Sequence, residues 1–238
     1  MKKMIFVLAV LFVTAPAMAG VVVEVVDLAA GCQVNINYDA NGTGNIRAFG
    51  LDITADGGAT IDAIDGLSAD YVIYPGSIVI NNNEVNDYGT PVASGVGALE
   101  GLGYSGITIE MGSLYEMGVD PAPAATGTLC TLTLSGLCNV TIEENTARGG
   151  VVMEDPSADA DPTLNGGAVT ECELACWSHT CQPQGDATTD GVINLADLAA
   201  LKAAWGSSSP SCADFNHDYS VNLADLAALK AGWGTPCP

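Results

Sequence analysis

The chain is 238 residues long and strongly acidic, because 28 Asp and Glu stand against 6 Lys and Arg and give a formal net charge of −22. Nucleic acids and anionic membrane surfaces are bound through Lys and Arg, so this charge argues against both as partners.

The first residues have the pattern of a secretory signal peptide. Lys2 and Lys3 precede an apolar run from Ile5 to Val13, and Ala17-Met18-Ala19 forms a small-residue cleavage site before Gly20. The apolar run is too short to span a bilayer, and no later stretch is long and apolar enough. We therefore predict a signal peptide at 1–19 and a secreted protein without membrane insertion, whose net charge is near −24 (4 − 28).

Residues 20–172 have the pattern of an all-β domain. Short runs rich in β-branched and aromatic residues alternate with turn clusters such as Asn41-Gly42 and Asp56-Gly57-Gly58. Many short strands with little helical periodicity predict a two-sheet β-sandwich of jelly-roll shape. The predicted strands are Val21–Val26, Cys32–Tyr38, Ile46–Thr54, Tyr71–Tyr74, Ser77–Ile80, Gly106–Met111, Thr128–Leu134, Val140–Glu143 and Gly150–Met153.

Two segments of this domain are similar to strands of known domains. Ile46–Thr54 and Gly127–Leu134 resemble the early and late strands of cohesins and related carbohydrate-binding sandwiches. The resemblance implies a cohesin-like shape, and it makes a polysaccharide a possible further partner.

No motif in the chain indicates catalysis. Glycosidases need two positioned carboxylates, and acids such as Glu143, Glu144 and Asp155 lie in no recognisable motif. With His179 and His217 as the only histidines, a Ser–His–Asp triad or a histidine zinc site is not indicated. We predict a non-catalytic protein. A carbohydrate-binding accessory protein is the first alternative, and a glycoside hydrolase the second.

Eight cysteines in an exported chain predict four disulfides rather than metal ligands. Placing Cys172 with the β-sandwich gives two even sets of four cysteines, so we set the boundary between 20–172 and 173–238 there. The sequence leaves the pairing open. A bridge at Cys237 would clasp the end of the C-terminal domain, which has only a small core.

The last quarter of the chain contains a duplication. The segment Asn194–Gly206 returns as Asn222–Gly234, with twelve of thirteen residues identical at a spacing of 28 (222 − 194). Each copy follows an Asp-rich run that fits a twelve-residue calcium loop. Oxygen side chains at positions 1, 3, 5 and 12, a carbonyl at 7 and a polar residue at 9 are what calcium requires.

A short apolar helix is predicted after each loop, closed by Gly206 in the first copy and by Gly234 in the second. Nothing helical precedes Asp186, so the unit is loop–helix. The helices are expected to pack together through the following side chains: Leu198, Leu201 and Trp205, with Leu226, Leu229 and Trp233.

A duplicated loop–helix unit over about 181–238 resembles a dockerin, the calcium module by which secreted proteins bind cohesin domains. The resemblance implies two calcium ions and a cohesin-like protein partner. The implied calcium ligands are Asp186, Thr188, Asp190, the carbonyl of Val192, Asn194 and Asp197, and then Asp214, Asn216, Asp218, the carbonyl of Ser220, Asn222 and Asp225. The implied partner-binding residues are Leu195, Ala196 and Lys202, and Leu223, Ala224 and Lys230.

The loops depart from the dockerin pattern at two positions. Thr188 supplies a neutral hydroxyl at position 3, and Tyr219 stands at position 6, where glycine is expected for a sharp turn with positive φ. One site is therefore expected to be weaker than the other. A further possibility is self-association, in which the β-sandwich of one copy accepts the C-terminal domain of another.

Overall fold

The computed structural model describes residues 20–29, 31–81, 84–87, 89–115, 120–155, 157, 160–207 and 210–235. The predicted signal peptide, residues 1–19, lies outside these ranges, as does Cys237. Within them, no helix is long and apolar enough to cross a membrane.

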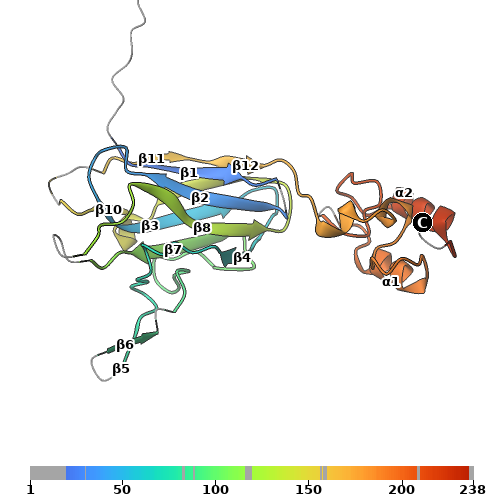
Figure 1. Ribbon diagram of the computed structural model, residues 1–238, viewed down its shortest axis with the longest axis horizontal. Helices are drawn as coiled ribbons and strands as arrows, with labels where there is room; N and C mark the ends of the chain where they lie inside the picture. Colours follow the sequence, from blue (N-terminus) through green and yellow to red (C-terminus); the bar gives the residue numbers. More distant parts are fainter. Residues whose placement is uncertain are drawn as a thin grey trace, which may run out of the picture.

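The N-terminal domain is a sandwich of two sheets (Figure 1). The strands of the first sheet have the order β11-β1-β2-β8-β4, and all neighbours are antiparallel except β1 and β11. Period-two alternation drives this pairing, since Val34, Ile36 and Tyr38 of β2 are buried and the residues between them are not. The strands are β1 (Val22–Asp27), β2 (Gln33–Asp39), β4 (Ile61–Asp65), β8 (Thr126–Leu134) and β11 (Thr163–Asn165).

The second sheet is built around its longest strand, β3 (Ile46–Ala55). This strand pairs with β7 (Gly106–Gly112), β9 (Cys138–Glu144) and β10 (Val151–Met153), and β9 continues the sheet to β12 (Gly167–Val169). The strands β5 (Val79–Asn81) and β6 (Glu84–Asp87) form a separate ladder that projects from the sandwich (Figure 1).

The core of the sandwich lies between the sheets and contains a cluster of three aromatic rings. Phe49 and Tyr38 both lie within 5.5 Å of Tyr71, measured between centroids. Of the predicted strands, Tyr71–Tyr74 is wrong, because it forms only an isolated bridge at Ile73. The predicted all-β sandwich is confirmed.

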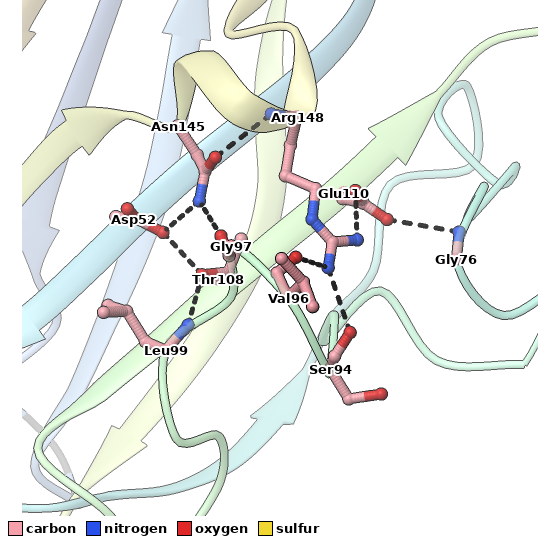
Figure 2. A network of polar contacts seen from close by, with 10 residues as sticks. All are labelled: Asp52, Gly76, Ser94, Val96, Gly97, Leu99, Thr108, Glu110, Asn145 and Arg148. Atoms are coloured by element: carbon pink, nitrogen blue, oxygen red, sulfur yellow. Dashed lines mark hydrogen bonds and ion pairs between the residues drawn. The ribbon is translucent and has the colours of Figure 1, made fainter.

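Polar side chains on the outer face of the second sheet hold a covering segment in place (Figure 2). Arg148, from the 3-10 turn η1 (Thr146–Arg148), forms a 2.7 Å ion pair with Glu110 of β7. Its guanidinium also donates to the carbonyls of Ser94 and Val96, each at 2.9 Å. Asn145 donates to Gly97 in the same segment. One of the few cations of the chain therefore has a structural role here.

The disulfides correct one prediction. Cys32 is bonded to Cys172, which places Cys172 with the sandwich, but Cys130 and Cys138 are buried free thiols. Because these two cysteines are unpaired, the prediction of four disulfides is wrong.

The C-terminal domain, called the module below, is a small helical unit (Figure 1). It contains the 3-10 turns η2 (Ala175–Ser178) and η3 (Gln182–Gln184) and the helices α1 (Leu195–Ala203) and α2 (Leu223–Gly232). Its core joins loop and helix residues of both repeats: Ile193, Leu201, Phe215, Val221 and Leu229. A β-sandwich followed by a small helical module is the predicted fold class.

Candidate metal centre

Each Asp-rich loop of the module begins with a fully buried carboxylate. Asp186 accepts hydrogen bonds from the backbone NH groups of Asp190 and Gly191, at 3.3 and 3.0 Å. In the second loop, Asp214 accepts from Asp218 and Tyr219, at 3.2 and 2.7 Å. The loops therefore curl around their first residue in the same way.

Each loop ends with a second buried carboxylate on the following helix. Asn194 and Asp197 form a capping box, in which the Asn194 side chain accepts from α1 and Asp197 accepts from the Asn194 backbone NH at 2.8 Å. Asn222 and Asp225 repeat this arrangement at the start of α2. The carboxylate at position 12 also accepts from a backbone NH near the start of its loop, that of Thr188 in the first loop and that of Phe215 in the second.

The remaining predicted ligands lie along the loops and are largely exposed. Thr188 donates its hydroxyl to Asp197 at 2.9 Å, whereas Asn216 donates its amide to Asp218 at 2.8 Å. Asp190 and Asp218 accept from the backbone NH groups of positions 7, which are Val192 and Ser220. Thr188 thus differs from its counterpart in orientation as well as in chemistry.

Both loops have the same unusual backbone at positions 4 and 6. In the first loop, Thr189 has a φ of 57° and Gly191 a φ of 83°. In the second, His217 has a φ of 58° and Tyr219 a φ of 61°. The predicted positive φ at position 6 is confirmed, and Tyr219 adopts it despite its side chain, at a cost of roughly 1–2 kcal/mol.

The carboxylates of the second loop lie close enough to influence one another. Burial raises the pKa of Asp214, and the carboxylates of Asp225 and Asp218 raise it further, while the NH groups of Tyr219 and Asp218 oppose the rise. Within the described ranges, no Lys or Arg pairs with Asp197, Asp214 or Asp225. Buried carboxylates of this kind are stabilised by a cation.

A second group of possible ligands lies at the first loop. The donor atoms of His179, Cys181 and Asp186 are within 4.8 Å of one another. Cys181, however, is disulfide-bonded, so it cannot supply the thiolate that a zinc site would use. This cluster does not form a separate metal site.

The predicted partner-binding residues lie on the exposed faces of the helices. Leu195 and Leu223 are 71% and 72% exposed, and the other predicted positions are exposed as well: Ala196, Lys202, Ala224 and Lys230. Leu195 and Leu223 occupy equivalent positions in the two repeats. Large apolar side chains exposed in this way indicate a protein-binding surface.

The expected packing of the helices holds for the leucines and is wrong for the tryptophans. Leu201 and Leu229 are buried, and Leu198 and Leu226 pack against them, but Trp205 and Trp233 are 48% and 44% exposed. The helices end at Ala203 and Gly232, before Trp205 and Trp233, so neither Trp belongs to the apolar face of its helix. Gly206 and Gly234 have positive φ but lie three and two residues beyond these ends.

Sequence reasoning missed the residues that hold the second loop from outside. Gln182 is fully buried and donates to the carbonyls of Cys212 and Asp214, at 3.1 and 2.7 Å. Trp177 stacks on His217, with centroids 4.4 Å apart, and donates to the Ser211 carbonyl at 2.9 Å. No local spacing indicates these contacts, because they join segments about 30 residues apart.

Two loop–helix repeats with buried carboxylates at both ends of each loop define a duplicated loop–helix module. Residues 184–232 match the model of the dockerin type I domain. The resemblance of this module to dockerins is thereby confirmed. No curated protein matches the chain.

The solved structures similar to the chain include several cohesins. A third cohesin ScaC, in complex with a ScaB dockerin, from Acetivibrio cellulolyticus has 12% identity over 64% of this chain and 99% of that chain, with a TM-score of 0.39. The seventh ScaB type I cohesin from Pseudobacteroides cellulosolvens has 9% identity over 66% and 96%, with a TM-score of 0.36. A non-cellulosomal cohesin from the archaeon Archaeoglobus fulgidus has 8% identity over 66% and 93%, with a TM-score of 0.33.

Proposed function

We propose that this protein is a secreted, non-catalytic docking protein, whose module at 173–238 binds two calcium ions and then attaches to a cohesin-like partner while displaying the sandwich at 20–172. The observation that carries this proposal is the geometry of the twin loops. Each loop has two fully buried carboxylates, at positions 1 and 12, and both accept hydrogen bonds from backbone NH groups of that loop.

The donor set fits calcium better than other metals. All side-chain donors are oxygens from Asp, Asn and Thr, which suit a hard cation with six to eight ligands. The first ion would be held by Asp186, Thr188, Asp190, the Val192 carbonyl, Asn194 and Asp197, and the second by Asp214, Asn216, Asp218, the Ser220 carbonyl, Asn222 and Asp225. The ion would neutralise carboxylates that repel one another, and this links its binding to the folding of the module.

The exposed helix faces supply the docking surface. Each presents a leucine beside the loop, alanines along the helix and one lysine near its end. Leu195, Ala196 and Lys202, or Leu223, Ala224 and Lys230, would contact an apolar partner surface that carries a carboxylate for the lysine. The match to the dockerin type I domain supports a cohesin as this partner.

The docked module would hold the sandwich at the surface of the partner. Its polar cluster around Arg148 and Glu110 is internally satisfied by hydrogen bonds to a covering segment (Figure 2), which supports a structural rather than a catalytic use of these charges. We place the protein in extracellular assemblies that degrade polysaccharides or decorate the cell surface.

Calcium titration of the mature chain by calorimetry tests the metal sites. The expected result is two ions bound per chain, together with a gain of helical circular dichroism. No binding, or a fold indifferent to chelator, would contradict the proposal.

Binding to immobilised type I cohesin domains tests the docking surface. A Leu195→Asp and Leu223→Asp double variant should lose calcium-dependent binding, because both apolar faces then carry a charge. Leu114→Asp is the matched control, since Leu114 is 84% exposed on the sandwich. Equal binding by the double variant and the control would exclude these faces as the docking surface.

A further inference from the structure

The second loop contacts the sandwich through the residue that departs from the dockerin pattern. The backbone of Tyr219 makes the hydrogen bond expected of a glycine at this position. Its NH donates to Asp214, as the NH of Gly191 donates to Asp186. Its side chain adds contacts that Gly191 lacks. A Cβ built on Gly191 would meet nothing within 4 Å.

The Tyr219 side chain reaches across the joint between the two domains. Its hydroxyl accepts a hydrogen bond from the backbone NH of Cys172 at 3.3 Å. Its ring packs against the core of the sandwich and meets the edge of Trp177, with centroids 5.5 Å apart. The left-handed strain at Tyr219 is therefore offset by contacts outside its own loop.

The joint that Tyr219 crosses is short and fixed at both ends. On the sandwich side, Cys172 is bonded to Cys32, and Glu173 exchanges backbone hydrogen bonds with Ala29 and Gly31 at 3.2 and 2.9 Å. On the module side, Cys176 is bonded to Cys212, directly before the second loop. Only residues 174 and 175 separate these two anchored points.

The first loop has Gly191 at the position of Tyr219, so it has no side chain there to reach the sandwich. The segment that precedes it packs on α2, where Gly185 lies so close that a Cβ would be 2.6 Å from the Cα of Leu229. The disulfide, the Trp177 stack and the Tyr219 hydroxyl all converge on the second loop. The two loops thus share the hydrogen bonds to their first residue, but they differ in their contacts with the rest of the protein.

We propose that Tyr219 fixes the orientation of the module relative to the sandwich, and that it does so while the second loop is closed around its ion. When Asp214, Asp218 and Asp225 lack a cation, their repulsion opens the loop, and the Tyr219 NH loses its acceptor on Asp214. The tyrosine then leaves Cys172 and Trp177. Filling the second loop would therefore restrict the movement of the docking face relative to the sandwich. The calcium part of this inference rests on the proposed metal sites.

The test is to measure the rotational correlation times of the two domains in the full mature chain by nitrogen-15 relaxation, with calcium and with chelator. Calorimetry on the same samples gives the number of bound ions. In the wild type with calcium, both domains should share one correlation time, and chelator should shorten that of the module.

The decisive variant is Tyr219→Gly, which relieves the left-handed strain and removes only the side chain. It should bind calcium at least as tightly as the wild type, yet its module should tumble faster than its sandwich. Tyr219→Asn, which tolerates the same φ, is the second variant. Val96→Gly, at a 99% exposed position of the sandwich, is the matched control that leaves the tyrosine and both loops in place.

A shared correlation time in Tyr219→Gly and Tyr219→Asn, or independent tumbling of the wild-type domains in calcium, would overturn the inference. If the wild type binds no calcium but Tyr219→Gly still separates the domains, the tyrosine bridge is supported. Its dependence on calcium is then overturned together with the proposed metal sites.

Discussion

The backbone NH of Gly206 lies 2.9 Å from the carbonyl oxygen of Val221, which joins the end of the first repeat to the loop of the second. The reciprocal bond runs from Gly234 to Ile193 at 3.0 Å. Val221 and Ile193 both occupy position 8 of their loops and are buried in the shared core. Each loop is therefore bonded to the glycine that follows the helix of the other repeat.

These reciprocal bonds predict that the two loops bind calcium cooperatively. Asp186→Asn alters only the first loop, yet it should weaken calcium binding at the second loop by about five-fold or more, a usual size for coupling between sites. Calorimetric titration against Asp65→Asn, a change at an exposed carboxylate of β4, would check this. An unchanged second site would mean that the loops act independently.

Asp225→Asn should change stability in opposite directions with and without calcium. Asp225 is fully buried and its charge lies near that of Asp214, so its neutralisation removes repulsion in the metal-free module. With calcium, the same change removes a proposed ligand and should lower the melting temperature. Thermal unfolding in calcium and in chelator measures both effects, and a shift of the same sign in both conditions would argue against a metal at Asp225.

The single difference between the thirteen-residue segments Asn194–Gly206 and Asn222–Gly234 predicts an asymmetric response to substitution. Ala204 of the first repeat corresponds to Gly232 of the second, where a Cβ would lie 2.2 Å from the Gln184 carbonyl oxygen. Gly232→Ala should therefore destabilise the module by about 1–3 kcal/mol, although alanine is the better helix former by roughly 1 kcal/mol. Ala204→Gly, the reverse change, should cost no more than that helix-propensity difference, and denaturant unfolding compares the two. A stabilised Gly232→Ala variant would show that η3 can move away from α2.

The free thiol of Cys130 predicts a loss of stability at alkaline pH. Burial raises its pKa from 9.0 to about 12, so between these values the unfolded chain releases a proton that the folded chain keeps. The free energy of unfolding should therefore fall as pH rises from about 9 toward 12, by up to about 1.4 kcal/mol per pH unit. Comparing the slope with that of Cys130→Ala isolates this thiol, since alanine does not titrate. Identical slopes for the two proteins would contradict the prediction.

The sequence predicted the module more fully than the sandwich because the module is encoded locally. Loop positions, capping residues and helix starts all lie within a dozen residues of one another, so Asn194 and Asp197 could be placed from spacing alone. The Trp205 prediction failed because spacing alone does not show where α1 ends. Gln182 and Trp177 act through tertiary contacts that no periodicity reveals.

In the sandwich, long alternating strands were recognisable, whereas several short ones were not. The strand β2 alternates over seven residues, whereas β11 and β12 have three residues each, and β4 carries three acidic or small residues among its five. Cysteine parity placed Cys172 with the sandwich, but counting could not show that Cys130 and Cys138 remain unpaired in its interior.

The disulfide between Cys32 and Cys172 spans 140 residues of sequence and joins the beginning of the sandwich to its end. During synthesis, Cys32 emerges first, and both Cys130 and Cys138 emerge before its true partner. The correct pairing must therefore wait until β8 and β9 have taken their cysteines into the interior. In this protein, strand assembly removes the competing thiols, and an oxidant that acted too early would trap the chain before the sandwich had closed.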